Sequence, residues 1–95
     1  METLLSAVTT DTTGTGASHS GPCTVMVHGD SVFDGATVSI EIADSDTSTD
    51  YAPLMDGTMR TDHGSFKCAA EGTYYLRAVL NNAGDSTSVT VVTVQ

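Results

Sequence analysis

The chain has 95 residues, of which 39% are hydrophobic, and this length and composition fit one domain with a small core. Three basic residues stand against twelve acidic ones, which gives a formal net charge of −9. A surface with this charge repels nucleic-acid phosphates and anionic lipids, so we expect neither a nucleic acid nor a membrane as a partner. Because so small a domain buries a modest share of its surface, we expect it to associate with copies of itself.

The first twenty residues divide into an apolar start and a polar tract. Leu4, Leu5 and Val8 give the start enough apolar surface for a strand or a binding arm. The tract that follows has no large apolar side chain and two glycines, so it cannot stay ordered on its own. We therefore treat residues 1–20 as an extended N-terminal arm, or as a first strand with a Thr/Gly linker, and residues 21–95 as the folded domain. An arm that added a strand to a neighbouring subunit would contact it through its leucines.

Alternating apolar and polar residues predict a series of short strands after the polar tract. The predicted strands cover residues 23–28, 36–43, 51–55, 59–61, 65–70, 73–80 and 87–94. Pro53 places the third of them at a sheet edge, because proline cannot donate a hydrogen bond to a neighbouring strand. No helical period is sustained, so the pattern predicts an all-β sandwich of about seven strands. The side chains expected in its core are Val25, Val27, Val38, Ile40, Ile42, Phe66, Tyr74, Leu76, Leu80 and Val91.

The last two predicted strands have the pattern of a hairpin. Residues 81–84, Asn-Asn-Ala-Gly, tolerate the backbone angles of a tight turn. Residues 87–94 are almost all β-branched, which favours a strand. Tyr74 and Tyr75 must point to opposite faces of their strand, so we expect Tyr74 in the core and Tyr75 exposed or at an interface.

Cys23 and Cys68 are the two cysteines of the chain. The sequence opens with an acid and a short apolar run instead of a signal peptide, so we expect synthesis in a cytoplasm. In such a reducing compartment two buried thiols are favoured over a disulfide. A zinc site would need more ligands than this spacing offers.

No residue pattern points to catalysis. The chain has no Gly-x-Ser-x-Gly elbow and no glycine-rich phosphate loop. His19, His28 and His63 are scattered over the tract, a strand end and a turn, and a metal site would require them to converge. Asp62 and Glu71 could form a carboxylate pair only across a cleft, which a small sandwich lacks. We expect no enzymatic activity, no metal and no cofactor.

Three aspartates in one loop have a spacing that can surround a calcium ion. Asp44, Asp46 and Asp50 stand at relative positions one, three and seven. An EF-hand also needs glycine at the sixth position and glutamate at the twelfth, where this chain has Thr49 and Met55. A solvated polar loop is therefore the favoured interpretation.

Gly72-Thr73-Tyr74 resembles the tyrosine corner of immunoglobulin-like domains, and the two closing strands resemble their strands F and G. The resemblance implies an Ig-like β-sandwich. Leu76 stands where antibody domains carry a cysteine, so the two cysteines of this chain do not correspond to the antibody bridge.

Three segments also resemble small structural proteins of tailed phages. They are residues 21–27 (Gly-Pro-Cys-Thr-Val-Met-Val), 33–38 (Phe-Asp-Gly-Ala-Thr-Val) and 72–74. The resemblance implies a non-enzymatic capsid decoration protein, made in the host cytoplasm and located on the virion surface. Its partners would be the major capsid protein and copies of itself, and a tail or fibre module that binds a receptor or glycan is the alternative. The residues expected at its interfaces are Leu4, Leu5, Val8 and Tyr75.

Overall fold

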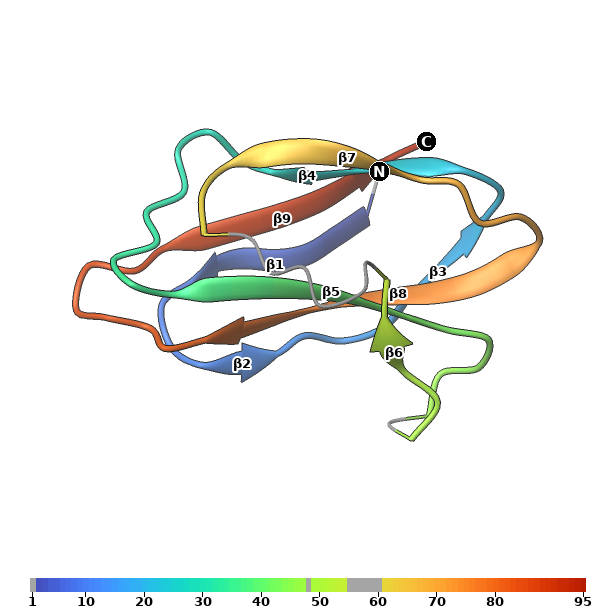
Figure 1. Cartoon of the computed structure of the whole chain (residues 1–95), viewed down its shortest axis with the longest axis horizontal. Helices are drawn as coiled ribbons and strands as arrows, with labels where there is room; N and C mark the ends of the chain where they lie inside the picture. Colours follow the sequence, from blue (N-terminus) through green and yellow to red (C-terminus); the bar gives the residue numbers. More distant parts are fainter. Residues whose placement is uncertain (1, 48, 55–60) are drawn as a thin grey trace.

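A computed structural model describes residues 2–47, 49–54 and 61–95. These residues form two antiparallel sheets that pack face to face, so the predicted all-β sandwich is confirmed (Figure 1). No helix among them is long and apolar enough to cross a membrane. The hairpin signal at Asp56-Gly57 and most of the predicted strand over residues 59–61 lie outside the described residues.

The two sheets contain nine strands in the described part of the chain, against about seven expected. The first sheet has the order β1 (Glu2–Val8), β9 (Val89–Val94), β4 (Cys23–Val27) and β7 (Gly64–Cys68). The second has the order β2 (Thr12–Thr13), β8 (Thr73–Asn81), β5 (Thr37–Ala43) and β6 (Ala52–Pro53), with β3 (Ala17–Ser20) also paired to β8. Pro53 lies in the edge strand β6, as its missing N–H predicted.

The expected closing hairpin is wrong, because β8 and β9 belong to different sheets. Asn82 does adopt the left-handed conformation that the turn chemistry indicated, with φ of 60°. However, both edges of β8 are occupied by β5 and by β2 and β3, and both edges of β9 by β1 and β4. With no edge left for each other, the two strands are joined by a connection that crosses between the sheets.

The N-terminal segment is part of the sandwich, and the structure does not show an arm. β1 pairs with β9, and a bulge between Thr3 and Leu5 lets two consecutive leucines turn inward. Leu4 and Leu5 are only 4% and 3% exposed. The Thr/Gly tract, predicted to be a linker, contributes β2 and β3 and pairs with β8 of its own domain.

Glycine is required between β2 and β3, where the backbone passes close to both β1 and β8. The N–H of Gly14 donates to the Ala78 carbonyl oxygen over 2.8 Å. A Cβ atom at this position would lie 2.8 Å from the Leu4 oxygen and 2.9 Å from the Ala78 oxygen, which is too close for any other residue. The Thr/Gly composition therefore permits close backbone approach and does not mark disorder.

The core fills the space between the sheets. Of the side chains predicted there, all are buried except Ile42 and Phe66, which are partly buried and pack against the rest. Along β8 the buried residues alternate with half-buried ones, as the sequence pattern indicated. This alternation places Tyr74 inside and Tyr75 on the outer face of the second sheet.

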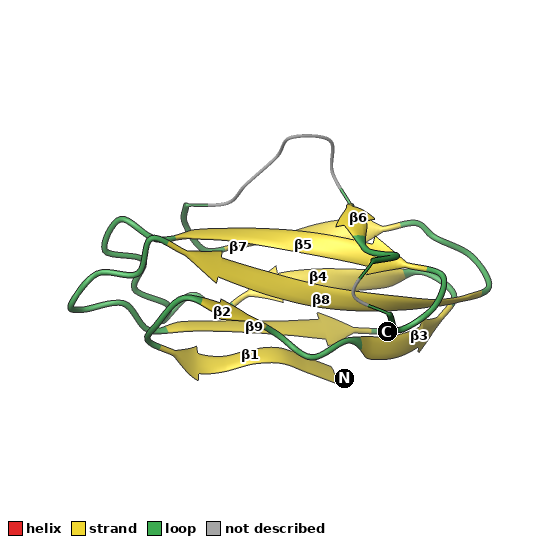
Figure 2. Ribbon diagram, turned by 90° about the horizontal axis from the view of Figure 1, so that it is seen from below, coloured by secondary structure: helices red, strands yellow, loops and turns green. Residues whose placement is uncertain are grey.

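The strands run along the long axis of the molecule, and the loops gather at its two ends (Figure 2). We call one of them the Gly21 end; it contains Gly21, Gly72 and the start of β8. The other is the Asp34 end, which contains Phe33, Asp34 and the β8–β9 connection.

Candidate functional site

The residues predicted for an interface do not form one surface. Leu4 and Leu5 are buried in the core, and Val8 is partly buried against it. Tyr75 is half-buried on the outer face of the second sheet, which is the opposite side of the molecule from β1. As long as β1 stays in place, the two leucines contact their own domain and are not available to a neighbour.

The outer face around Tyr75 carries a chain of polar contacts. The Arg77 Nε donates to Glu41 Oε1 over 2.6 Å, between directly paired residues of β8 and β5. The guanidinium carbon lies 4.0 Å from the centre of the Tyr51 ring, and the Tyr51 hydroxyl donates to Asp46 over 2.8 Å. Burial and this hydrogen bond raise the pKa of Tyr51 to about 12. The contacts hold the loop after β5 against the sheet.

A buried polar cluster closes the Gly21 end. The His19 Nδ1 donates to the Ala17 carbonyl oxygen over 2.9 Å, and in the neutral ring Nε2 then accepts from the Thr93 hydroxyl at 2.6 Å. The His19 ring stacks on Tyr74, with centroids 5.7 Å apart. The Tyr74 hydroxyl in turn donates to the Gly21 carbonyl oxygen over 2.6 Å. His19, Thr93 and Tyr74 are each at most 4% exposed, so this network is shielded from water.

The two cysteines lie beside this cluster. Cys23 and Cys68 are free thiols, as predicted, and both are buried. The Tyr74 hydroxyl is 3.4 Å from the Cys23 sulfur. Burial raises the pKa of the Cys23 thiol, and burial also raises the pKa of Tyr74 above its usual range. Both groups are therefore neutral at ordinary pH, as their apolar surroundings require.

The Asp34 end is closed by turn residues. The Asp34 carboxylate accepts a hydrogen bond from the Ser86 N–H over 2.9 Å. The Thr87 hydroxyl donates to the Phe33 carbonyl oxygen over 2.7 Å and accepts from the Gly84 N–H over 2.8 Å. These bonds tie the β4–β5 connection to the β8–β9 connection.

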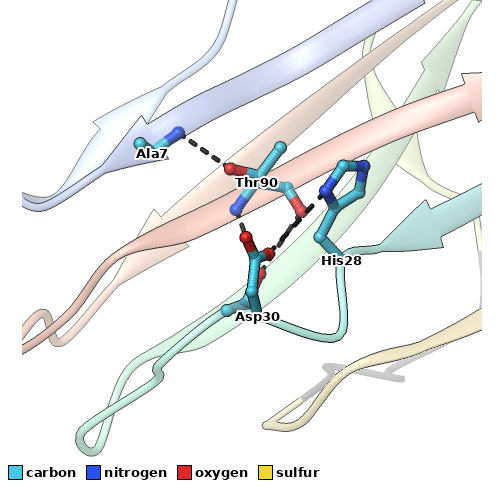
Figure 3. Close-up of polar contacts among 5 residues, drawn as sticks. Ala7, His28, Asp30 and Thr90 are labelled. Atoms are coloured by element: carbon cyan, nitrogen blue, oxygen red, sulfur yellow. Dashed lines mark hydrogen bonds and ion pairs between the residues drawn. The ribbon is translucent and has the colours of Figure 1, made fainter.

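A serine, a histidine and an aspartate occur together at the Asp34 end, but they are not a catalytic triad (Figure 3). The His28 Nδ1 lies 3.7 Å from an Asp30 oxygen. The Ser31 oxygen accepts from the Thr90 N–H over 3.1 Å and its hydroxyl points to the Thr90 carbonyl oxygen at 3.5 Å. The Thr90 side chain accepts from the Ala7 N–H over 3.0 Å. The serine therefore anchors the backbone of β9 and is not activated by the histidine.

Within the described ranges, the other acidic and histidine side chains do not assemble a metal site. Among the described residues no three His, Cys, Asp or Glu side chains lie close enough to hold a metal ion. The carboxylate of Asp50 accepts hydrogen bonds from Ser45 and Thr47, which lower its pKa. Asp62 precedes β7 at the Asp34 end, whereas Glu71 precedes Gly72 at the other end, so they cannot form a carboxylate pair.

A shallow hollow opens at the Gly21 end. It has a volume of about 400 Å³, and Asp44, Asp50, Glu71 and Thr73 line it together with apolar atoms. Sequence reasoning missed this hollow and the buried cluster beside it, because both depend on strand register. The only signal in the sequence was the isolated His19 in a tract that otherwise looked unstructured.

No family model matches the chain, and neither a curated protein nor a solved structure is significantly similar to it.

Proposed function

We propose that the chain is a non-enzymatic structural protein of a tailed-phage virion, where it decorates or stabilises the capsid surface. Its partners would be the major capsid protein and copies of itself. The proposal rests on the resemblance of three sequence segments to such proteins, and fold alone does not carry it.

The observation that carries the proposal is the position of these three segments in the sandwich. The Gly21 N–H donates to the Gly72 carbonyl oxygen over 3.0 Å, and the Tyr74 hydroxyl donates to the Gly21 carbonyl oxygen. These two hydrogen bonds join the first segment to the third. The second segment contains Phe33 and Asp34, which accept hydrogen bonds from the β8–β9 connection at the opposite end. The resemblance therefore involves the residues that fix both ends of the domain, which supports a shared structural role.

The pairing of the central strands supports an Ig-like sandwich. β4 pairs with β7 in one sheet and β5 with β8 in the other. Strands B and E, and strands C and F, have the same relation in immunoglobulin-like domains. The outer positions differ, since β9 lies next to β4, and β2 and β3 take the place beside β8. Tyr74 also bonds to Gly21 on a distant segment, whereas a tyrosine corner bonds to backbone a few residues upstream.

Cryo-electron microscopy of virions whose genome encodes this chain tests the proposal. We expect density for the sandwich on every capsomer, and loss of that density from particles produced without the gene. Density confined to the tail would favour the alternative described next. Purified particles that contain none of the chain by mass spectrometry would contradict both.

The hollow at the Gly21 end favours a glycan-binding tail or fibre module as the second candidate. Exposed carboxylates such as Asp44 and Glu71 can accept hydrogen bonds from sugar hydroxyls, and a hollow of this size admits a monosaccharide. A glycan array with the purified chain tests this candidate. Binding that Glu71→Gln weakens, while Glu2→Gln on the edge strand β1 of the first sheet does not, would support it. An array without signal would contradict it.

A further inference from the structure

Cys23 and Cys68 lie directly opposite each other on neighbouring strands. β4 and β7 pair antiparallel, and their register sets Cys23 against Cys68 and Val25 against Phe66. Both cysteines point between the sheets and are only 4% and 1% exposed. Directly opposed residues of an antiparallel pair have Cα atoms about 4.5–5.5 Å apart, and disulfides need about 4.4–6.8 Å. The backbone therefore already holds the two thiols at a separation that suits a disulfide.

We propose that this pair is an oxidation site, at which a low-molecular-weight disulfide such as oxidised glutathione converts the two thiols into an intramolecular Cys23–Cys68 disulfide. The first cysteine thiolate attacks a sulfur of the glutathione disulfide, and one glutathione thiol leaves. The second cysteine then attacks the protein sulfur of this mixed disulfide, and the second glutathione thiol leaves. Two electrons and two protons pass from the protein to the glutathione disulfide, so the exchange is balanced. The inference does not depend on the proposed function.

The position of β7 decides the order of attack. Among the described strands β7 pairs only with β4, so it is an edge strand, and Cys68 is its last residue. Ala69 next to it is exposed, and fraying of this strand end brings the Cys68 sulfur to solvent. Cys23 lies on an inner strand, where burial raises the pKa of its thiol and disfavours the reactive thiolate. Cys68 therefore attacks first and Cys23 resolves the mixed disulfide.

The neighbouring groups tolerate the new bond. Tyr74 keeps its hydrogen bond to the Gly21 carbonyl oxygen when the Cys23 thiol is consumed, so no buried polar group loses its partner. The disulfide closes a loop from residue 23 to residue 68 and restricts the unfolded chain. The oxidised protein should therefore keep its fold and melt at a higher temperature.

The test uses the full chain in buffers with graded ratios of oxidised to reduced glutathione. Equilibrium is approached from the reduced folded protein and, separately, from protein refolded in the same buffer. Trypsin cleaves after Lys67 and Arg77 and releases Cys68 in the peptide 68–77. We expect an intact mass lower by two hydrogens, a peptide 68–77 that is linked to the Cys23 peptide until a reductant is added, and a melting temperature raised by on the order of 10 °C.

The single variants Cys23→Ala and Cys68→Ala are the controls, and neither should gain a higher melting temperature at any glutathione ratio, because neither can close the intramolecular disulfide. Three outcomes would overturn the proposal: thiols that stay alkylatable after denaturation at every ratio, oxidation that stops at a glutathione adduct, or an oxidised chain that melts below the reduced one. A disulfide that forms only during refolding would contradict the attack by Cys68 from the frayed strand.

Discussion

Buried side chains close the Gly21 end of the sandwich, whereas the Asp34 end is closed mainly by bonds in exposed turns. At the Gly21 end His19 and Tyr74 form hydrogen bonds that water cannot replace. At the Asp34 end the carboxylate of Asp34 accepts from an exposed Ser86 N–H. Thr87 is the exception there, because this residue is only 2% exposed and its hydroxyl donates to the Phe33 carbonyl oxygen. The loss of a partner therefore leaves an unsatisfied buried group at the first end, while solvent takes its place at most of the second.

Deletion of residues 1–20 should have the largest effect. The deletion removes β1, β2 and β3, the buried leucines of β1, and His19 from the Gly21 end. It also exposes one edge of β8 and one of β9. We expect the truncated chain to lose its cooperative thermal transition, measured by circular dichroism and calorimetry. A truncated chain that still melts cooperatively would mean that these residues are a detachable arm.

Tyr74→Phe should destabilise the protein by about 1–3 kcal/mol, measured by urea denaturation, because it leaves the Gly21 carbonyl oxygen without its close partner. Tyr75→Phe is the matched control on the outer face of the same strand. We expect it to change the free energy of unfolding by no more than about 0.5 kcal/mol. Equal effects of the two variants would contradict the conclusion that the buried cluster stabilises the domain more than the outer face of β8 does.

Alkaline pH should destabilise the domain. Burial raises the pKa of Tyr74, and burial raises that of Tyr51 to about 12, so the native state favours the neutral phenols. Their contribution to stability is complete below the pKa of an unfolded tyrosine, about 10, and is lost as the pH rises above it. Urea midpoints should therefore fall above pH 10, and less steeply in Tyr74→Phe. Midpoints that stay constant to pH 12 would contradict this coupling.

Asp11→Ala should have a smaller effect than Tyr74→Phe. The Asp11 carboxylate accepts from the Ala83 N–H over 2.8 Å in an exposed position at the Asp34 end. We expect the free energy of unfolding to fall by only about 0.5–1 kcal/mol, because water can take the place of the carboxylate as the acceptor for the Ala83 N–H. Asp11→Asn keeps an acceptor oxygen and should restore most of the loss. A loss of stability as large as that of Tyr74→Phe would contradict the conclusion that the two ends differ in their sensitivity to a lost hydrogen bond.

The strand faces could be predicted from the sequence, but the partners of the strands could not. Alternation in β4, β5 and β8 depends only on the period of a strand, and it identified most of the core. The order of the strands depends on which strand edges are free. Both edges of β8 and both edges of β9 are occupied by other strands, so these two strands do not pair as a hairpin. The tract around Gly14 lacks large apolar side chains, so hydropathy did not indicate its backbone pairing with β8.

The candidate sites were less predictable than the fold, because each depends on register. Cys23 and Cys68 were expected on strands, yet only the pairing of β4 with β7 sets them opposite each other. His19 looked isolated in the sequence, although the fold brings it against Thr93 and Tyr74. Conversely, His28, Asp30 and Ser31 are close in the sequence and still form no triad, since the serine is bonded to Thr90.

Native-state hydrogen exchange along β8 tests the contrast between the two ends most directly. This one strand runs from the Gly21 end at Thr73 to the Asp34 end at Asn81, and it has partners on both edges at each end. Residues 74–76 should exchange at least about tenfold more slowly than residues 79–81, because the buried cluster opens only with the whole domain. Equal rates, or faster exchange at residues 74–76, would contradict the account.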